Sequence, residues 1–173
     1  MLRRCLTWLR DNFHPLWRLR KFAWYRRLQK AIDFPVTHRL GGIRYSVMLL
    51  RDFSLLVPRA GDELRTHMVF EKILRHGAIT HLFDVGANVG LFTWHALGVT
   101  PSLNVSLFEP DATNVRLLKK TITTNRLNRV SIWEGIAGAA TGEVEFLVDE
   151  ASGTTGSIRD CQHRSETHLL PAV

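Results

Sequence analysis

Residues 80–97, THLFDVGANVGLFTWHAL, constrain the fold of this chain more than any other segment. The apolar run at residues 82–85 predicts a buried strand, GANVG predicts a tight turn, and the residues after Gly90 predict the start of a helix. Gly86 lets the backbone leave the strand at a dihedral that side chains disfavour, and Asn88 tolerates the left-handed region. A helix that starts here directs free N–H groups and the positive end of its dipole above the turn. The segment therefore predicts a ligand-binding site at the end of a strand.

The glycine spacing separates this turn from two common nucleotide-binding motifs. A dinucleotide fingerprint requires G-x-G-x-x-G, and a P-loop requires Lys-Ser/Thr after its last glycine. Neither is present, because Gly86 and Gly90 stand four apart with Asp84 two residues before the first. Glu109 ends the next alternating apolar run, at residues 103–107, so we expect it at the carboxyl end of a second parallel strand. A carboxylate there can bind ribose hydroxyls, which predicts a nucleoside pocket without a pyrophosphate site.

Three segments together resemble the FkbM-type branch of the class I, S-adenosylmethionine-dependent methyltransferases: DVGANVGLFT, LFEPDATNVRLLKKTITTN and NRVSIWEGIAGAATGEVEF. The resemblance covers roughly residues 82–158 and implies a Rossmann-like sheet with S-adenosyl-L-methionine as cofactor. It implies cofactor contacts for Asp84, Gly86, Asn88, Gly90, Glu109 and Ala137. In this assignment the first four line the amino-acid end of the cofactor, Glu109 takes the ribose hydroxyls and the backbone at Ala137 approaches the adenine. The alternative is a generic α/β corner without a cofactor.

The implied activity is methyl transfer to an oxygen of a small hydroxylated acceptor, such as a sugar or a secondary metabolite. The family continues past its inserted hairpin with an Asp-Val-Glu-Gly stretch and further core strands, whereas this chain has only a short apolar piece at residues 168–173. We therefore assign no catalytic residue, and a truncated gene, a fragment and half of a split enzyme all fit. The alternative function is a non-catalytic remnant or a membrane-surface binding module that retains the cofactor motif.

The 173 residues suffice for one domain with a core of its own. We divide the chain into a basic, aromatic-rich helical extension at residues 1–33, a leading hairpin and helix at residues 34–77, and an incomplete methyltransferase domain at residues 78–173. The fold class expected is α/β: the N-terminal half of a Rossmann-like class I methyltransferase sheet behind a helical extension.

Periodicity and turn residues predict the elements within these segments. Strands are expected at residues 43–50, 53–57, 103–107, 130–137 and 142–148, with a loop at residues 149–157 that either covers the pocket or faces solvent. Helices are expected on both sides of Pro15, from Asp62 to Gly77, from the glycine turn to Gly98, and from Asp111 as N-cap to Asn125.

The helix after the glycine turn has one predicted buried face. Spacings of three and four residues place Val89, Phe92 and Ala96 on it, and we expect this face to pack on the sheet. Trp94 and His95 lie off the stripe. The sequence by itself does not favour a catalytic role for His95.

Positive charge is concentrated at the N-terminus. Residues 1–30 hold nine Lys or Arg and one acid, Asp11, whereas the remainder holds 14 basic and 15 acidic residues. Arginine interleaved with tryptophan suits either a packed helical extension or peripheral contact with an anionic membrane through residues 1–33. We expect no nucleic-acid partner, because no nucleic-acid module follows. An open half sheet predicts association through its exposed edges.

No run of 18 apolar residues and no charge-free leader is present, so we expect neither a spanning helix nor a secretory signal. Cys5 and Cys161 stand far apart and the eight histidines are scattered, which predicts neither a disulfide framework nor a metal site. A cytoplasmic location, with peripheral contact at the inner face of the membrane as an addition, fits these features best.

Overall fold

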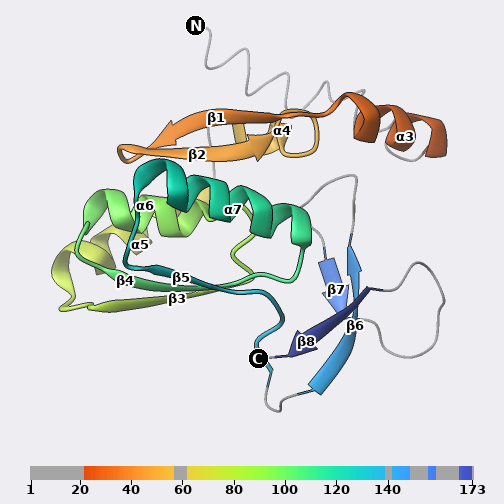
Figure 1. Cartoon of the computed structure of the whole chain (residues 1–173). Helices are drawn as coiled ribbons and strands as arrows, with labels where there is room; N and C mark the ends of the chain where they lie inside the picture. Colours follow the sequence, from red (N-terminus) through yellow and green to blue (C-terminus); the bar gives the residue numbers. More distant parts are fainter. Residues whose placement is uncertain (1–21, 57–61, 139–141, 149–155, 159–167, 173) are drawn as a thin grey trace, which may run out of the picture.

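The structure is a computed structural model that describes residues 22–56, 62–138, 142–148, 156–158 and 168–172 (Figure 1). Its centre is a parallel sheet of three strands in the order β3-β4-β5. These strands are β3 (His81–Val85), β4 (Asn104–Phe108) and β5 (Val130–Trp133). Helix α6 (Leu91–Val99) connects β3 to β4, and helix α7 (Ala112–Asn125) connects β4 to β5. This alternation of parallel strands and helices confirms the predicted α/β, Rossmann-like fold class.

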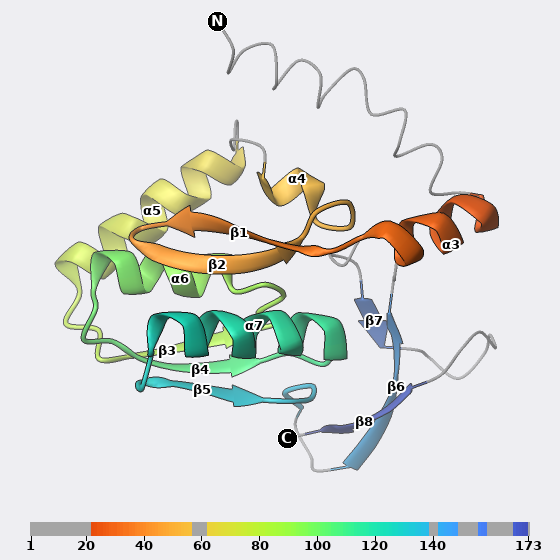
Figure 2. The same ribbon diagram turned by 45° about the horizontal axis from the view of Figure 1, so that its top comes forward.

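The sheet, helices α6 and α7, and an antiparallel hairpin form three successive layers (Figures 1 and 2). The hairpin consists of β1 (Pro35–Leu40) and β2 (Ile43–Met48), and turns at Gly41 and Gly42. It is tied to α7, because the Ser46 backbone N–H donates to Thr121 Oγ1 at 3.0 Å. Apolar side chains from the three layers and from α5 make the core: Tyr45, Val47, Leu74, Ala87, Val89, Trp94, Ala96, Leu97, Leu103, Val105, Leu107, Leu117 and Leu118. The core therefore lies on one side of the sheet.

Residues 53–56 are not a strand, contrary to the prediction for residues 53–57, of which residue 57 lies outside the described residues. Residues Phe53–Leu56 form the short helix α4. The reason is a tight turn after β2, in which the Asp52 N–H donates to the Met48 carbonyl at 3.1 Å and the Leu55 N–H donates to the Asp52 carbonyl at 2.8 Å. The Asp52 carboxylate also accepts the Met48 N–H at 2.8 Å. The backbone N–H groups of Met48, Asp52 and Leu55 are thus used in local hydrogen bonds and are not available for pairing with a strand.

Helix α5 (Asp62–His76) forms as predicted and ends before Gly77, whose N–H donates to the Ile73 carbonyl at 2.8 Å. It packs beside α6, where the His67 ring stacks on Phe92 with centroids 4.5 Å apart. Phe92 therefore packs on α5 and not on the sheet, and it remains 38% exposed. The other two residues of the predicted face, Val89 and Ala96, are buried.

Trp94 is fully buried, although its position lies off the predicted stripe. Its indole Nε1 donates to the Val89 carbonyl at 2.6 Å, which satisfies the polar atom of the ring. A Cβ on Gly90 would lie 2.6 Å from this ring, so the glycine makes room for the tryptophan. The hydrogen bond and the space at Gly90 explain why a residue outside the apolar stripe becomes part of the core.

Gly98 does not end α6, which continues to Val99. A Cβ at this position would stand 2.7 Å from the Gly41 Cα in the hairpin turn. The absence of a side chain therefore serves close packing between the helix and the hairpin. The backbone N–H of Thr100 donates to the Ala96 carbonyl and closes the helix.

Helix α7 begins where it was predicted, with Asp111 as N-cap accepting the N–H groups of Thr113 and Asn114. The predicted inward residues Val115 and Leu118 are buried. Strand β5 ends at Trp133, earlier than predicted, so Ala137 lies in the loop that follows.

A third sheet follows, with the order β7-β6-β8 and antiparallel pairing. Its strands are β6 (Gly142–Val148), β7 (Gly156–Ile158) and β8 (His168–Ala172). Strand β6 was predicted. Gly156 and Ser157 belong to β7 and not to a loop, because they pair with β6, while the predicted loop residues 149–155 lie outside the described residues.

The N-terminal helix of the described part is α3 (Ala23–Ile32), as predicted for the segment after Pro15. The helix predicted before Pro15 lies outside the described residues. Where the chain is described, no helix is long and apolar enough to span a membrane.

The face of the sheet opposite α6 and α7 bears exposed apolar side chains. Phe83, Val85 and Trp133 are 64%, 62% and 47% exposed. The rings stack across the strands, with Phe83 to Phe108 at 6.4 Å and Phe108 to Trp133 at 6.2 Å. Within the described ranges β3 has a strand neighbour on one side only, so an apolar face and an unpaired edge occur together.

Candidate functional site

The glycine turn has the backbone conformation that the sequence predicts. Gly86, Asn88 and Gly90 have φ angles of 73°, 54° and 81°, all in the left-handed region. The N–H groups of Gly86 and Ala87 both donate to the Phe108 carbonyl, at 2.9 and 3.1 Å. The end of β3 is therefore locked to the end of β4. A Cβ on Gly86 would meet no atom within 4 Å, so open space adjoins the turn here.

Glu109 lies directly beside this turn and is 4% exposed. Its Oε2 accepts the Asn88 N–H at 2.6 Å, and its Oε1 accepts the Asp111 N–H at 2.9 Å and the Asn114 side-chain amide at 3.2 Å. The structure thus brings together two of the predicted site residues, Asn88 and Glu109. A carboxylate offers about four acceptor positions, so about one remains, on Oε2. A further hydroxyl donor can be accepted there.

Burial raises the pKa of Glu109 above its ordinary value of 4.5, and the three N–H donors oppose this effect without cancelling it. The pKa of Asp84 is likewise raised by burial, against a hydrogen bond from Thr93. Thr93 is fully buried and its Oγ1 donates to Asp84 Oδ2 at 2.7 Å. Two carboxylates with raised pKa values therefore lie at neighbouring strand ends, as in many ligand sites.

Asn88 adds an acceptor to this corner. Its Oδ1 is buried and has no hydrogen-bond partner within the part of the chain that the structure describes. A buried acceptor without a donor is costly, so a ligand N–H or O–H at this point would be stabilising. Asp84, Asn88 and Glu109 together favour a ligand rich in hydrogen-bond donors or carrying a positive charge.

The loop after β5 approaches the same corner. The Glu109 N–H donates to the Trp133 carbonyl at 3.1 Å, and the Gly135 N–H donates to the Glu109 carbonyl at 3.2 Å. Ala137, predicted to approach the adenine, is exposed and stands two residues beyond Gly135. Its role in binding stays a prediction.

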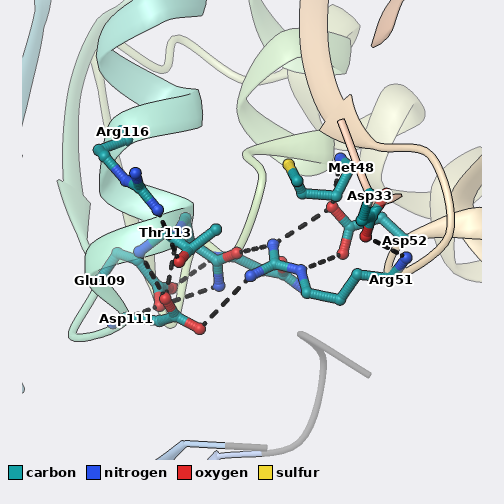
Figure 3. Close-up of polar contacts among 10 residues, drawn as sticks. Asp33, Met48, Arg51, Asp52, Glu109, Asp111, Thr113 and Arg116 are labelled. Carbon is teal, nitrogen blue, oxygen red and sulfur yellow. Dashed lines mark hydrogen bonds and ion pairs between the residues drawn. The ribbon is translucent and has the colours of Figure 1, made fainter. Parts of the chain in front are cut away.

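A buried polar network, which the sequence patterns above do not predict, supports Glu109 from the side of the hairpin (Figure 3). The guanidinium of Arg51, 6% exposed, donates to both carboxylate oxygens of Asp52, at 2.9 and 3.2 Å. It also donates to Asn114 Oδ1 and lies 3.6 Å from Asp111 Oδ2. Asn114 therefore bridges Arg51 and Glu109. We define the Arg51 network as Arg51, Asp52, Asp111, Asn114 and Glu109.

A signal for this network does exist in the sequence. Arg51 and Asp52 are adjacent opposite charges within the otherwise mainly apolar residues 45–57. Charges that interrupt an apolar segment are commonly buried as a pair. The partners of the pair, however, stand about 60 residues further along the chain, and local pattern does not identify them.

His95 lies among α5 side chains, with its Nε2 3.4 Å from Glu71 Oε2 and its ring centroid 5.3 Å from that of His67. Across the described residues no group of three or more His, Cys, Asp or Glu side chains is placed to hold a metal ion. The polar corner at Asp84, Asn88 and Glu109 is the candidate site, because it joins two carboxylates with raised pKa values to an acceptor without a partner among the described residues.

No protein-family model and no curated protein matches the sequence. Among solved structures, the chain is similar to TYW2 of P. horikoshii in complex with MeSAdo, with 18% identity, a TM-score of 0.46, and coverage of 64% of this chain and 39% of that one. It is similar to Trm5b of Pyrococcus abyssi, with 19% identity, a TM-score of 0.42 and coverage of 58% and 28%. For the precorrin-6y C5,15-methyltransferase of Geobacter metallireducens the identity is 15%, the TM-score 0.35 and the coverage 44% and 43%. The chain thus spans less than half of the length of each of these proteins.

Proposed function

We propose that this chain binds S-adenosyl-L-methionine at the carboxyl ends of β3 and β4 and serves in methyl transfer. The observation that carries the proposal is the hydrogen bond from the Asn88 N–H to Glu109 Oε2, at 2.6 Å, which unites the glycine turn and the second strand end in one corner. Open space beside Gly86 leaves room for a ligand against the turn. The sequence resemblance supplies the identity of the cofactor.

The residues present fit the chemical groups of this cofactor. Asp84 and the free acceptor of Asn88 suit its ammonium group, and the remaining acceptor position of Glu109 suits a ribose hydroxyl. When bound, the cofactor supplies a methyl group on a sulfonium that is already electrophilic. The contribution of the chain is then to bind and orient it, and Glu109 serves binding and not proton transfer.

The finer proposal is O-methylation of a small hydroxylated acceptor by an FkbM-type enzyme. It is supported by the three sequence segments that resemble this branch and by the site they share. We assign no residue to the acceptor or to proton removal.

The alternative is that the chain acts only together with another polypeptide, or binds without catalysis. The stack of the exposed Phe83 and Trp133 on the half-buried Phe108, next to the edge of β3 that has no strand neighbour within the described ranges, favours action with another polypeptide. An apolar sheet face needs a covering layer, and an unprotected edge accepts a further strand. Association through this edge and face is therefore part of the proposal.

The test is calorimetric titration of the full chain with S-adenosylhomocysteine. Loss of a charge-assisted hydrogen bond costs about 1.5–3 kcal/mol, so Asp84→Asn and Glu109→Gln should each weaken binding by about tenfold to a hundredfold. Glu71→Gln is the matched control, since Glu71 is a carboxylate on α5 that pairs with Arg75 outside the corner. Equal affinities in all four proteins, or no binding by a folded chain, would refute the proposal.

A further inference from the structure

Helix α3 has an unusual division of its side chains between core and solvent. It buries Tyr25 and Gln29 and leaves Trp24, Leu28 and Ile32 exposed, at 58%, 47% and 54%. These three follow one another at intervals of four residues and therefore form one stripe along the helix. A helix whose stripe served only the core would bury these residues. The stripe is thus directed to something other than the core of the described chain.

Two further exposed aromatic side chains flank α3, one before the helix begins and one after it ends. Phe22 is 53% exposed and its ring stacks on Trp24 at 6.4 Å. Phe34, 54% exposed, follows the C-terminal end of α3. We call Phe22, Trp24, Leu28, Ile32 and Phe34 the α3 stripe. A set of exposed large apolar side chains gathered on one helix and its flanking residues marks an interaction surface.

The helix is also cationic. It carries Arg26, Arg27 and Lys30, all exposed, and it contains no acidic residue. The nearest acid, Asp33, directs its two carboxylate oxygens to the N–H groups of Leu50 and Arg51, at 2.8 and 2.9 Å. The partner that complements this surface is therefore anionic as well as apolar.

Helix α3 is fixed to the rest of the fold. The bonds from Asp33 join its C-terminal end to the start of the Arg51 network (Figure 3), and the Leu49 N–H donates to the Phe34 carbonyl at 3.0 Å. In Figures 1 and 2 the helix extends past the end of the hairpin, at the edge of the described structure. A surface that binds α3 would consequently hold the whole domain in a defined orientation.

We propose that the α3 stripe docks on an anionic lipid surface. Leu28 and Ile32 gain by entering the acyl boundary, while aromatic rings suit the headgroup zone and arginines reach the lipid phosphates. A nucleic acid would use the arginines and aromatics but offers nothing to the two aliphatic side chains. A second copy would cover the stripe but bring two sets of like charges together. This inference does not depend on the proposed function.

The experiment is flotation of the full chain with phosphatidylcholine vesicles, with and without phosphatidylserine. We expect binding only to the anionic vesicles, and release at high salt. Arg26→Gln with Arg27→Gln should weaken binding by about 30-fold, because each cation near an anionic surface contributes about fivefold. Trp24→Ser with Leu28→Ser and Ile32→Ser should abolish it. Met68→Ser with Val69→Ser and Ile73→Ser is the control, since these α5 residues are equally exposed.

Three outcomes would overturn the proposal: no binding of the wild-type chain to anionic vesicles, binding of the α3 variants that equals that of the wild type, or an equal loss in the α5 control. Circular dichroism establishes that each variant is folded, and the arginine pair keeps the test valid if the triple variant is not. Two further results also count against it: competition by a single-stranded oligonucleotide at low concentration, and a dimer in gel filtration that is lost in the α3 variants.

Discussion

Replacement of Arg51 by methionine tests the physical basis of the buried network. Arg51 and Asp52 have side chains that are 6% and 0% exposed, and the guanidinium meets both carboxylate oxygens. Burial raises the pKa of Asp52 above its ordinary value of 3.8 even with the arginine in place. Arg51→Met leaves this carboxylate without its cation, and breaking a buried pair in this way costs about 3–5 kcal/mol of unfolding free energy.

The double variant Arg51→Met with Asp52→Asn separates the charge from the rest of the site. The amide oxygen of Asn still accepts the Met48 N–H that Asp52 Oδ2 accepts in the wild type. The charges of the Arg51–Asp52 pair are then both removed, while Asp111 loses its 3.6 Å contact with the guanidinium in both variants. The loss that comes from this pair reduces to hydrogen bonds, about 1–3 kcal/mol. Urea unfolding, followed by circular dichroism, measures both variants, and the double variant should be the more stable of the two.

The sign of the pH dependence follows from the same pair. In Arg51→Met the pKa of Asp52 rises further, so the folded state binds this proton more tightly than the unfolded state does. The unfolding free energy of the single variant is therefore furthest below that of the double variant at neutral pH, and the difference shrinks as pH falls through the raised pKa of Asp52. Equal stability of the two variants at neutral pH, or a gap that widens on acidification, would refute the reasoning.

Three further predictions concern the turn, the site and the sheet. Gly90→Ala should lower the unfolding free energy by about 2–4 kcal/mol, because this residue has a positive φ and its new Cβ would meet the Trp94 ring at 2.6 Å. Gly86→Ala should lower it by only about 1–2 kcal/mol, because its positive φ is strained for alanine but its Cβ would meet no atom. Thermal unfolding compares them, and equal losses would contradict the packing argument. Burial raises the pKa of Glu109, so the folded state binds this proton more tightly than the unfolded state does. The contribution of Glu109 to the unfolding free energy therefore declines as pH rises from 4.5, the ordinary pKa, through the raised pKa. The difference between wild type and Glu109→Gln, measured by urea unfolding across this window, should follow that course, and a difference independent of pH would exclude it. Trp133→Ser removes a 47% exposed ring from the open face and should reduce concentration-dependent association in analytical ultracentrifugation. Unchanged association would place the contact elsewhere.

The elements predicted correctly are those whose signals are local. A few consecutive residues determine each of three such elements: strand β3, the left-handed turn at Gly86 and Asn88, and the helix cap at Asp111. Glycine and asparagine tolerate positive φ wherever they occur, and an aspartate before a helix bonds N–H groups two and three residues away. Such preferences act within the segment itself, so the sequence determined the βα corner and the positions of its candidate site residues.

Other features depended on residues distant in the chain, and only the tertiary structure decided them. Gly98 serves close packing and not helix termination, because the hairpin turn at Gly41 occupies the space that a side chain at position 98 would need. Trp94 is buried through a bond to the Val89 carbonyl, and periodicity places it elsewhere. The link from Glu109 through Asn114 to Arg51 joins segments about 60 residues apart. Periodicity tells which face of an element is apolar, whereas the partner of a buried charge is settled only when the layers pack.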